Sequence, residues 1–148
     1  MKRFLVVSLL SLSTALSAMA QPSEKQVAAD ASNFHRFRIT ALAKATEIDK
    51  KRPGENAGVN YLGIECKKLA QRTSPDYLYG IVTDLIQDTS RMEEPYQIAI
   101  MVLDNYPPNE ARAVIKKILA DPRYSACGDV KDWDWEIDEA QKGKTIAK

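Results

Sequence analysis

Residues 27–48 read VAADASNFHRFRITALAKATEI, and this stretch sets the fold class. Apolar side chains recur in it every three or four residues, which is the period of an α-helix with one buried face. The members of this series are Val27, Ala31, Phe34, Ala41, Ala45 and Ile48. Arg38 alone breaks the series. Because Pro53 and Gly54 oppose continuation, the sequence predicts a long amphipathic helix followed by a loop over residues 52–58.

Further stripes at helical spacing follow this loop. The second stripe is Val59, Leu62, Cys66 and Leu69, which places Cys66 on a buried face. A third helix is expected to start at Ser74, a hydroxyl cap, with Pro75 at the first helical position and Asp76 near the positive end of the helix dipole. Its apolar face is Leu78, Ile81, Val82, Leu85 and Ile86.

Residues 96–106 are apolar on nearly every side and predict a central helix. A buried strand is the competing interpretation, because the run is short and rich in β-branched residues. Pro107 and Pro108 end the run, and Asn109 is expected to cap the next helix, which Pro122 ends. The apolar face of that helix is Ala111, Val114, Ile115, Ile118 and Leu119. A last helix begins near Asp129, with Val130, Trp133, Ile137 and Ala140 on one face.

The amino-terminal segment has the order of a cleavable secretory signal peptide. Lys2 and Arg3 precede an apolar run over residues 4–16, and Ala18-Met19-Ala20 supplies the small residues of a cleavage site after Ala20. The run is too short to span a bilayer as a helix, which disfavours the alternative of a retained anchor. We therefore expect residues 1–20 to be removed and the mature protein to act in the periplasm.

The mature chain is expected to be all-α: a small single-domain bundle of about six helices over residues 21–143, with a flexible tail at 144–148. Cys66 and Cys127 are its two cysteines. In an oxidising compartment such a pair predicts one disulfide, worth about 4 kcal/mol for a loop of roughly 60 residues. A reactive thiol or a bridge between chains are the alternatives.

Charge and motifs exclude several functions. The chain has 21 basic and 20 acidic residues, and loss of Lys2 and Arg3 leaves the signs nearly balanced, which does not suit a nucleic-acid binder. His35 is the only histidine, so we expect a surface or boundary residue and neither a metal site nor a cofactor. No hydrolase or phosphate-loop motif is present. Asp76, Asp84 and Glu94 are carboxylates that could act in hydrolysis, but no motif singles them out.

The last helix carries the strongest candidate binding site. Acidic residues alternate with other residues in it, as in a calcium loop: Asp132, Asp134, Glu136 and Asp138. A calcium loop, however, needs glycine and glutamate at the positions that Ile137 and Gly143 occupy here. Acids that complement the helix dipole are the simpler interpretation. Trp135 lies off the apolar face and is expected to point outward. An exposed tryptophan ringed by acids predicts a protein-binding site made of Trp135 and the four acids.

Basic residues gather on the first two predicted helices. They are Arg36, Arg38, Lys44, Lys50, Lys51 and Arg52 on and after the first, and Lys67, Lys68 and Arg72 on the second. We interpret them as a solvated face. Contact with an acidic partner or with lipid head groups is the alternative.

These features predict a small exported protein-binding module with no enzymatic activity. In size, export, helicity and paired cysteines it is similar to exported immunity proteins that neutralise cell-wall-degrading effectors, such as the amidase-immunity proteins of the type VI secretion system. This likeness is an analogy carried by no residue motif. It implies a partner such as a secreted peptidoglycan hydrolase, inhibited by occlusion. A periplasmic acid-stress chaperone is the first alternative, and an enzyme or enzyme subunit is the second.

Overall fold

The computed structural model describes residues 20–88 and 93–146, and all regular structure within these ranges is helical. The helices are α1 (Glu24–Lys51), α2 (Ala57–Arg72), α3 (Leu78–Gln87), α4 (Glu93–Leu103), α5 (Pro108–Ala120) and α6 (Gly128–Ile146), and a short 3-10 turn, η1 (Pro75–Tyr77), leads into α3. The predicted all-α class and helix number are confirmed. The strand interpretation of residues 96–106 is wrong, because α4 covers most of them. Residues 1–19 of the predicted signal peptide, which spans residues 1–20, lie outside the described residues.

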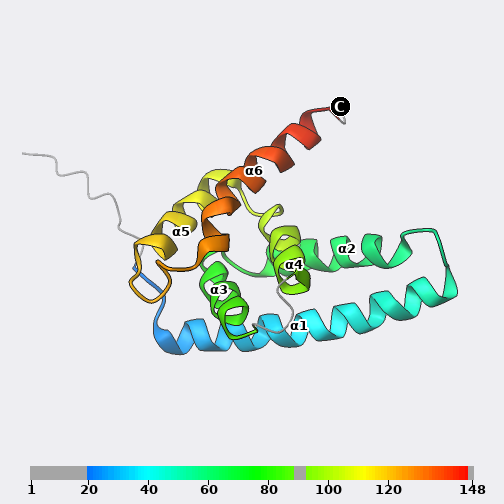
Figure 1. The fold of residues 1–148 in the computed structure, drawn as a ribbon, viewed down its shortest axis with the longest axis horizontal. Helices are drawn as coiled ribbons and strands as arrows, with labels where there is room; N and C mark the ends of the chain where they lie inside the picture. The colour runs from blue at the N-terminus through cyan, green and yellow to red at the C-terminus, as the bar shows by residue number, and fades with distance from the viewer. Residues whose placement is uncertain (1–19, 89–92, 147–148) are drawn as a thin grey trace, which may run out of the picture.

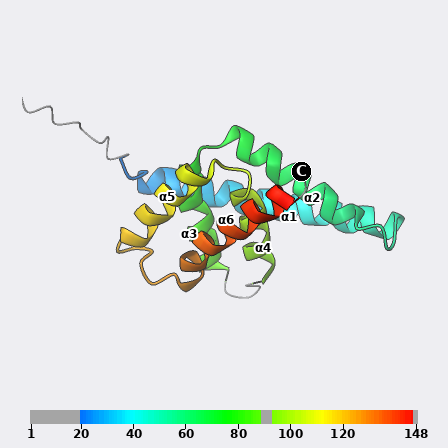
Figure 2. The same ribbon diagram turned by 90° about the horizontal axis from the view of Figure 1, so that it is seen from above.

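The longest helix, α1, forms one side of the molecule, and α2 folds back along it as a hairpin (Figure 1). α3 and α4 stand against this hairpin, and α5 and α6 lie on the side away from α1 (Figure 1). The main packing partners of α1 are α3 and α2, while α2 also packs on α4 and α5 packs on α6. Seen from above, the far end of the α1–α2 hairpin extends beyond the other helices (Figure 2).

Most of the predicted apolar stripes lie in the core, which also contains Tyr77, Tyr79 and Tyr124. On α1, the buried members of the stripe are Val27, Ala31, Phe34, Ala41 and Ala45, while Ile48 is half-buried. On α5, Ala111, Val114, Ile115 and Ile118 are fully buried, and on α6 so are Val130 and Trp133. Burial of large side chains at this spacing supplies the main favourable free energy of folding.

Two of the predicted core residues whose side chains are described are exposed instead, and the side chain of Ala140 lies outside the described ones. Val59 is 58% exposed because the first turns of α2 lie in the projecting part of the hairpin, where neighbouring Gly58 is buried against α1. There the Gly58 N–H donates to Oδ1 of Asp49 at 2.7 Å, and a Cβ on Gly58 would lie 2.2 Å from Oδ2. Ile86 is 44% exposed, because it lies in the last turn of α3, past the covered part of its face.

Helix ends differ in detail from the sequence interpretation. The Ser74 hydroxyl makes no capping bond, and Pro75 begins a 3-10 turn, so α3 starts only at Leu78. Asn109 is not the cap of α5: Pro107 holds that position and Pro108 is the first helical residue, where its missing N–H costs nothing. α6 continues to Ile146, past the predicted boundary at Gly143.

The predicted disulfide is not formed, and Cys66 and Cys127 are both free thiols that lie apart. The prediction is wrong because the two helices concerned have different neighbours. Cys66 is buried on α2, which packs mainly on α1 and α4, whereas Cys127 is half-buried just before α6, which packs mainly on α5. Burial raises the pKa of the Cys66 thiol to about 12 and also raises that of Cys127.

Replacing Gly80 tests the closest approach of α1 and α3. A Cβ at Gly80 would lie 2.4 Å from the Cβ of Asp30 and 2.6 Å from the backbone nitrogen of Ala31, so the two helices would have to separate. We expect Gly80→Ala to lower the free energy of unfolding by about 2–3 kcal/mol. Gly63→Ala is the matched control: its Cβ would meet only Cε of Met101 at 3.8 Å, and helix propensity predicts a neutral or stabilising change of up to about 1 kcal/mol. Denaturant unfolding measures both, and equal effects would contradict the tight contact.

Alkylation of the cysteines tests the absence of a bridge. In the folded protein at pH 8 we expect iodoacetamide to modify Cys127 first, because Cys66 is fully buried and holds its proton more tightly. Unfolding without reductant should expose two modifiable thiols in each chain, counted by mass spectrometry. If protein isolated from its natural compartment reacts with iodoacetamide only after reduction, the cysteines are bridged there and the prediction of a disulfide stands.

Candidate functional site

The residue that interrupts the apolar stripe of α1 is buried where α1 meets α3 and α4. Arg38 is 3% exposed. Its Nη2 donates to Oδ2 of Asp88 at 2.6 Å, and its Nη1 donates to Oε1 of Glu94 at 3.0 Å. Its Nε lies 3.6 Å from Oδ2 of Asp84. One guanidinium thus joins α1 to α3, to the residue after α3, and to α4.

Asp84 is the most enclosed of the three carboxylates, at 5% exposure. Burial raises its pKa, and the positive charge of Arg38, together with that of His35 when it is protonated, acts against that rise. A buried carboxylate without a nearby cation would take up a proton. The charge of Asp84 therefore depends on Arg38.

His35 lies at the edge of the same cluster, with 49% of its side chain exposed. Its Nδ1 is 3.2 Å from Nη2 of Arg38 and 3.5 Å from Oδ1 of Asp84. The expectation of a boundary residue fits this position. Arg38 lies three positions further along the same helix, whereas Asp84 becomes a neighbour only when α1 packs against α3, so residue spacing alone did not identify it.

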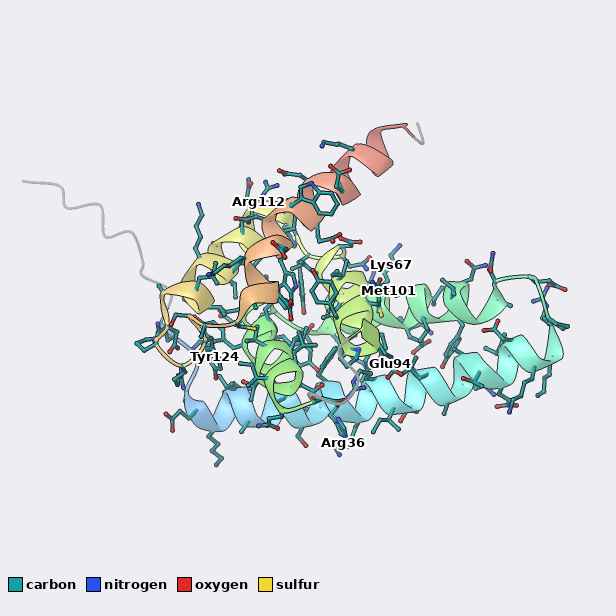
Figure 3. All side chains as sticks on the ribbon, viewed as in Figure 1. Arg36, Lys67, Glu94, Met101, Arg112 and Tyr124 are labelled. Atoms are coloured by element: carbon teal, nitrogen blue, oxygen red, sulfur yellow. The ribbon has the colours of Figure 1, made fainter. Side chains whose placement is uncertain are left out.

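The cluster forms the floor of a groove of about 1000 Å³ between α1 and α3. Ile39, Leu42 and Ala43 of α1 supply an apolar wall, and Ile39 is 52% exposed. Figure 3 shows Glu94 where the start of α4 approaches α1. Within residues 20–88 and 93–146, no group of three or more His, Cys, Asp or Glu side chains is arranged to hold a metal ion.

Of the three carboxylates that could act in hydrolysis but that no sequence motif singles out, two pair with the same arginine. Asp84 and Glu94 both pair with Arg38. Asp76 lies elsewhere, in η1, where Nζ of Lys117 is 3.5 Å from its Oδ1. The sequence signal that could have identified the cluster is Arg38 itself, because an arginine at the centre of an apolar stripe has to be buried with acids around it.

The predicted basic face needs one correction, because Arg38 is buried and does not belong to it. Several other members are paired with acids on their own helices, such as Lys44 and Lys51 with Glu47, and Lys68 with Glu65. Arg36 lies on the exposed side of α1 and donates to Asn33 (Figure 3). These local pairs favour the interpretation of a solvated surface.

On α6, the predicted phase is confirmed for both tryptophans. Trp133 is fully buried, and Trp135 is 60% exposed. Val130 and Ile137 are buried with Trp133 and hold this part of the helix against the core.

The four acids of the predicted site lie in two rows. Asp134 and Asp138 face Arg112 of α5, which is hydrogen-bonded to Asp138 and has its Nε 3.9 Å from Oδ1 of Asp134. Figure 3 shows Arg112 where α5 and α6 run side by side. The other row, Asp132 and Glu136, lies towards α4.

The pKa of Tyr96 in α4 indicates where this second row lies. Burial raises the pKa of Tyr96, and the negative charges of Glu136 and Asp132 raise it further. Trp135 therefore projects from α6 between an acidic row towards α5 and another towards α4. We call Trp135 and these four acids the Trp135 face.

Comparison with known proteins assigns no family to the chain. No protein-family model, curated protein or solved structure matches it at a significant level. Within the described ranges, no helix combines the length and the apolar character needed to cross a membrane. Function has to be argued from the side chains themselves.

Removing the buried guanidinium should be strongly destabilising. Arg38→Met keeps the length of the side chain but leaves Asp84 buried without its cation, so we expect a loss of about 3–5 kcal/mol in the free energy of unfolding. Arg36→Met is the matched control on the exposed side of the same helix, and its effect should stay within about 0.5 kcal/mol. Urea unfolding at neutral pH compares the two. A loss below 1 kcal/mol for Arg38→Met would mean that the cluster does not hold the helices together.

Proposed function

We propose that the protein is a small exported binding module that acts by covering another protein with its Trp135 face. The observation that carries this proposal is the 60% exposure of Trp135 on a helix whose inner tryptophan, Trp133, is completely buried. An indole left in water is unfavourable, and tryptophan is among the residues that contribute most to binding when a partner covers them.

The position of Trp135 suits binding with little loss of conformational freedom. It lies on a helix and not on a loop, and Val130, Trp133 and Ile137 fix that helix to the core. Arg112 adds a polar contact from α5 on one side. A side chain presented from a rigid element loses less entropy on association than one on a mobile segment.

The charges around Trp135 indicate the chemistry of the partner. Two acidic rows flank the indole, and Arg112 neutralises part of only one of them. A partner with basic side chains around an apolar pocket would match this pattern, and the opposite charges would accelerate association. For an exported protein, inhibition of a secreted peptidoglycan hydrolase by occlusion is the specific form of the proposal.

Neither alternative function gains support from the described residues. The acid-chaperone alternative drew in part on a single disulfide, as the immunity-protein analogy drew on paired cysteines, and Cys66 and Cys127 are free thiols. A hydrolase would need carboxylates available to a substrate, whereas Asp84 and Glu94 both pair with Arg38.

A crosslinking experiment followed by binding measurements tests the proposal. A photo-crosslinking amino acid at position 135, introduced in the natural host, identifies the bound protein, and the same group at Val59 is the control at an equally exposed apolar site. With the purified partner, we expect Trp135→Ala to weaken binding by about 30-fold, equivalent to roughly 2 kcal/mol, with little change in melting temperature.

Trp133→Ala and Val59→Ala complete the design. Trp133→Ala should destabilise the fold by about 3–5 kcal/mol, because Trp133 is fully buried, whereas Val59→Ala should leave both folding and binding unchanged. The proposal fails if position 135 yields no crosslinked protein beyond that seen at position 59, or if Trp135→Ala binds the captured protein as tightly as the parent does.

A further inference from the structure

Nδ1 of His35 has two partners with opposite hydrogen-bonding requirements. Nη2 of Arg38 lies 3.2 Å away and can only donate, because a guanidinium has no acceptor. Oδ1 of Asp84 lies 3.5 Å away and, when ionised, can only accept. A single ring nitrogen can satisfy one of these groups at a time, so the protonation state of the ring decides which one it binds.

A neutral His35 is suited to Arg38. Its Nδ1 then carries a lone pair that accepts from Nη2, and its one proton sits on Nε2. A protonated His35 is suited to Asp84, because both ring nitrogens become donors. The contact with Arg38 then joins two positive charges and becomes unfavourable.

We propose that proton binding by His35 exchanges its partner from Arg38 to Asp84, and that this exchange resets the floor of the groove between α1 and α3. The group that faces His35 on α1 is Arg38, and Asp84 faces it from α3. Among the described residues, Asp88, after α3, and Glu94 of α4 are the other charged groups that bond to Arg38. Because these two carboxylates still hold the guanidinium after the exchange, the cluster rearranges and does not come apart.

His35 is well placed to sense pH. Half of its side chain is exposed and can reach solvent protons, while Arg38 and Asp84 are buried. It is also the only histidine of the chain, and histidine is the side chain whose charge ordinarily changes between about pH 5 and 8. The inference concerns the groove and is independent of the Trp135 face on α6.

The single histidine makes the test direct, because long-range nitrogen–proton NMR spectra contain the ring of His35 alone. At pH 8 we expect the proton on Nε2 and an unprotonated Nδ1. The Nε–H signal of Arg38, identified by its loss in Arg38→Lys, should shift as the pH falls from 8 to 5. In His35→Gln this shift should be absent over the same range.

Two variants separate the exchange from a structural effect. His35→Gln should unfold at pH 8 at nearly the same urea concentration as the parent, since position 35 is half-exposed. Asp84→Asn removes the anionic acceptor, so the Nδ1 proton at pH 5 should exchange with water faster than in the parent. A neutral ring protonated on Nδ1 at pH 8 in the parent overturns the proposal. So does an Arg38 signal that shifts equally in the parent and in His35→Gln.

Discussion

The fold depends on one buried cation meeting carboxylates from two other helices. A guanidinium in an apolar core is unfavourable unless its hydrogen bonds and its charge are matched. Arg38 obtains its charge match, and hydrogen bonds from Nη1 and Nη2 to carboxylates, only when α3 and α4 stand beside the middle of α1, while its Nε lies 3.6 Å from Asp84 without a hydrogen bond. Apolar burial makes the helices associate, and the Arg38 cluster favours one arrangement among those that would bury the same stripes.

Close backbone contacts support the same arrangement. At Gly80, α3 lies so near to Asp30 and Ala31 of α1 that no side chain fits between them. At Gly58, α2 approaches α1 with equal closeness, and Asp49 accepts the backbone N–H there. These two glycines set the distance of α2 and α3 from α1, and the separation of α1 and α3 in turn determines the groove and the surroundings of His35.

The two candidate sites rest on different physical features. The Trp135 face is a rigid, exposed indole between acidic rows, and it suits recognition of a basic protein surface. The groove between α1 and α3 is lined by charged side chains, and we propose that their bonding depends on His35. We therefore propose a constant binding surface on α6 and, beside α1, a charged cluster whose bonding changes with pH.

Local periodicity was enough to predict the helices and the phase of α6. A helix repeats every 3.6 residues whatever lies around it, so the stripe through Val130, Trp133 and Ile137 already implied that Trp135 points outward. The same logic failed at Val59, because the pattern does not say how far a helix extends past its neighbours. The sequence also contained the break at Arg38, but nothing in it identified the partners.

The sequence by itself therefore determined the helical class, the buried faces and the outward tryptophan, all of which follow from spacing within a single helix. Only the tertiary structure decided that Cys66 and Cys127 remain apart, and that Arg38 meets Asp88 and Glu94, which lie 50 and 56 positions further along the chain. The physical reason is that such contacts depend on how the helices cross and how closely their backbones approach, and residue spacing carries no information on either.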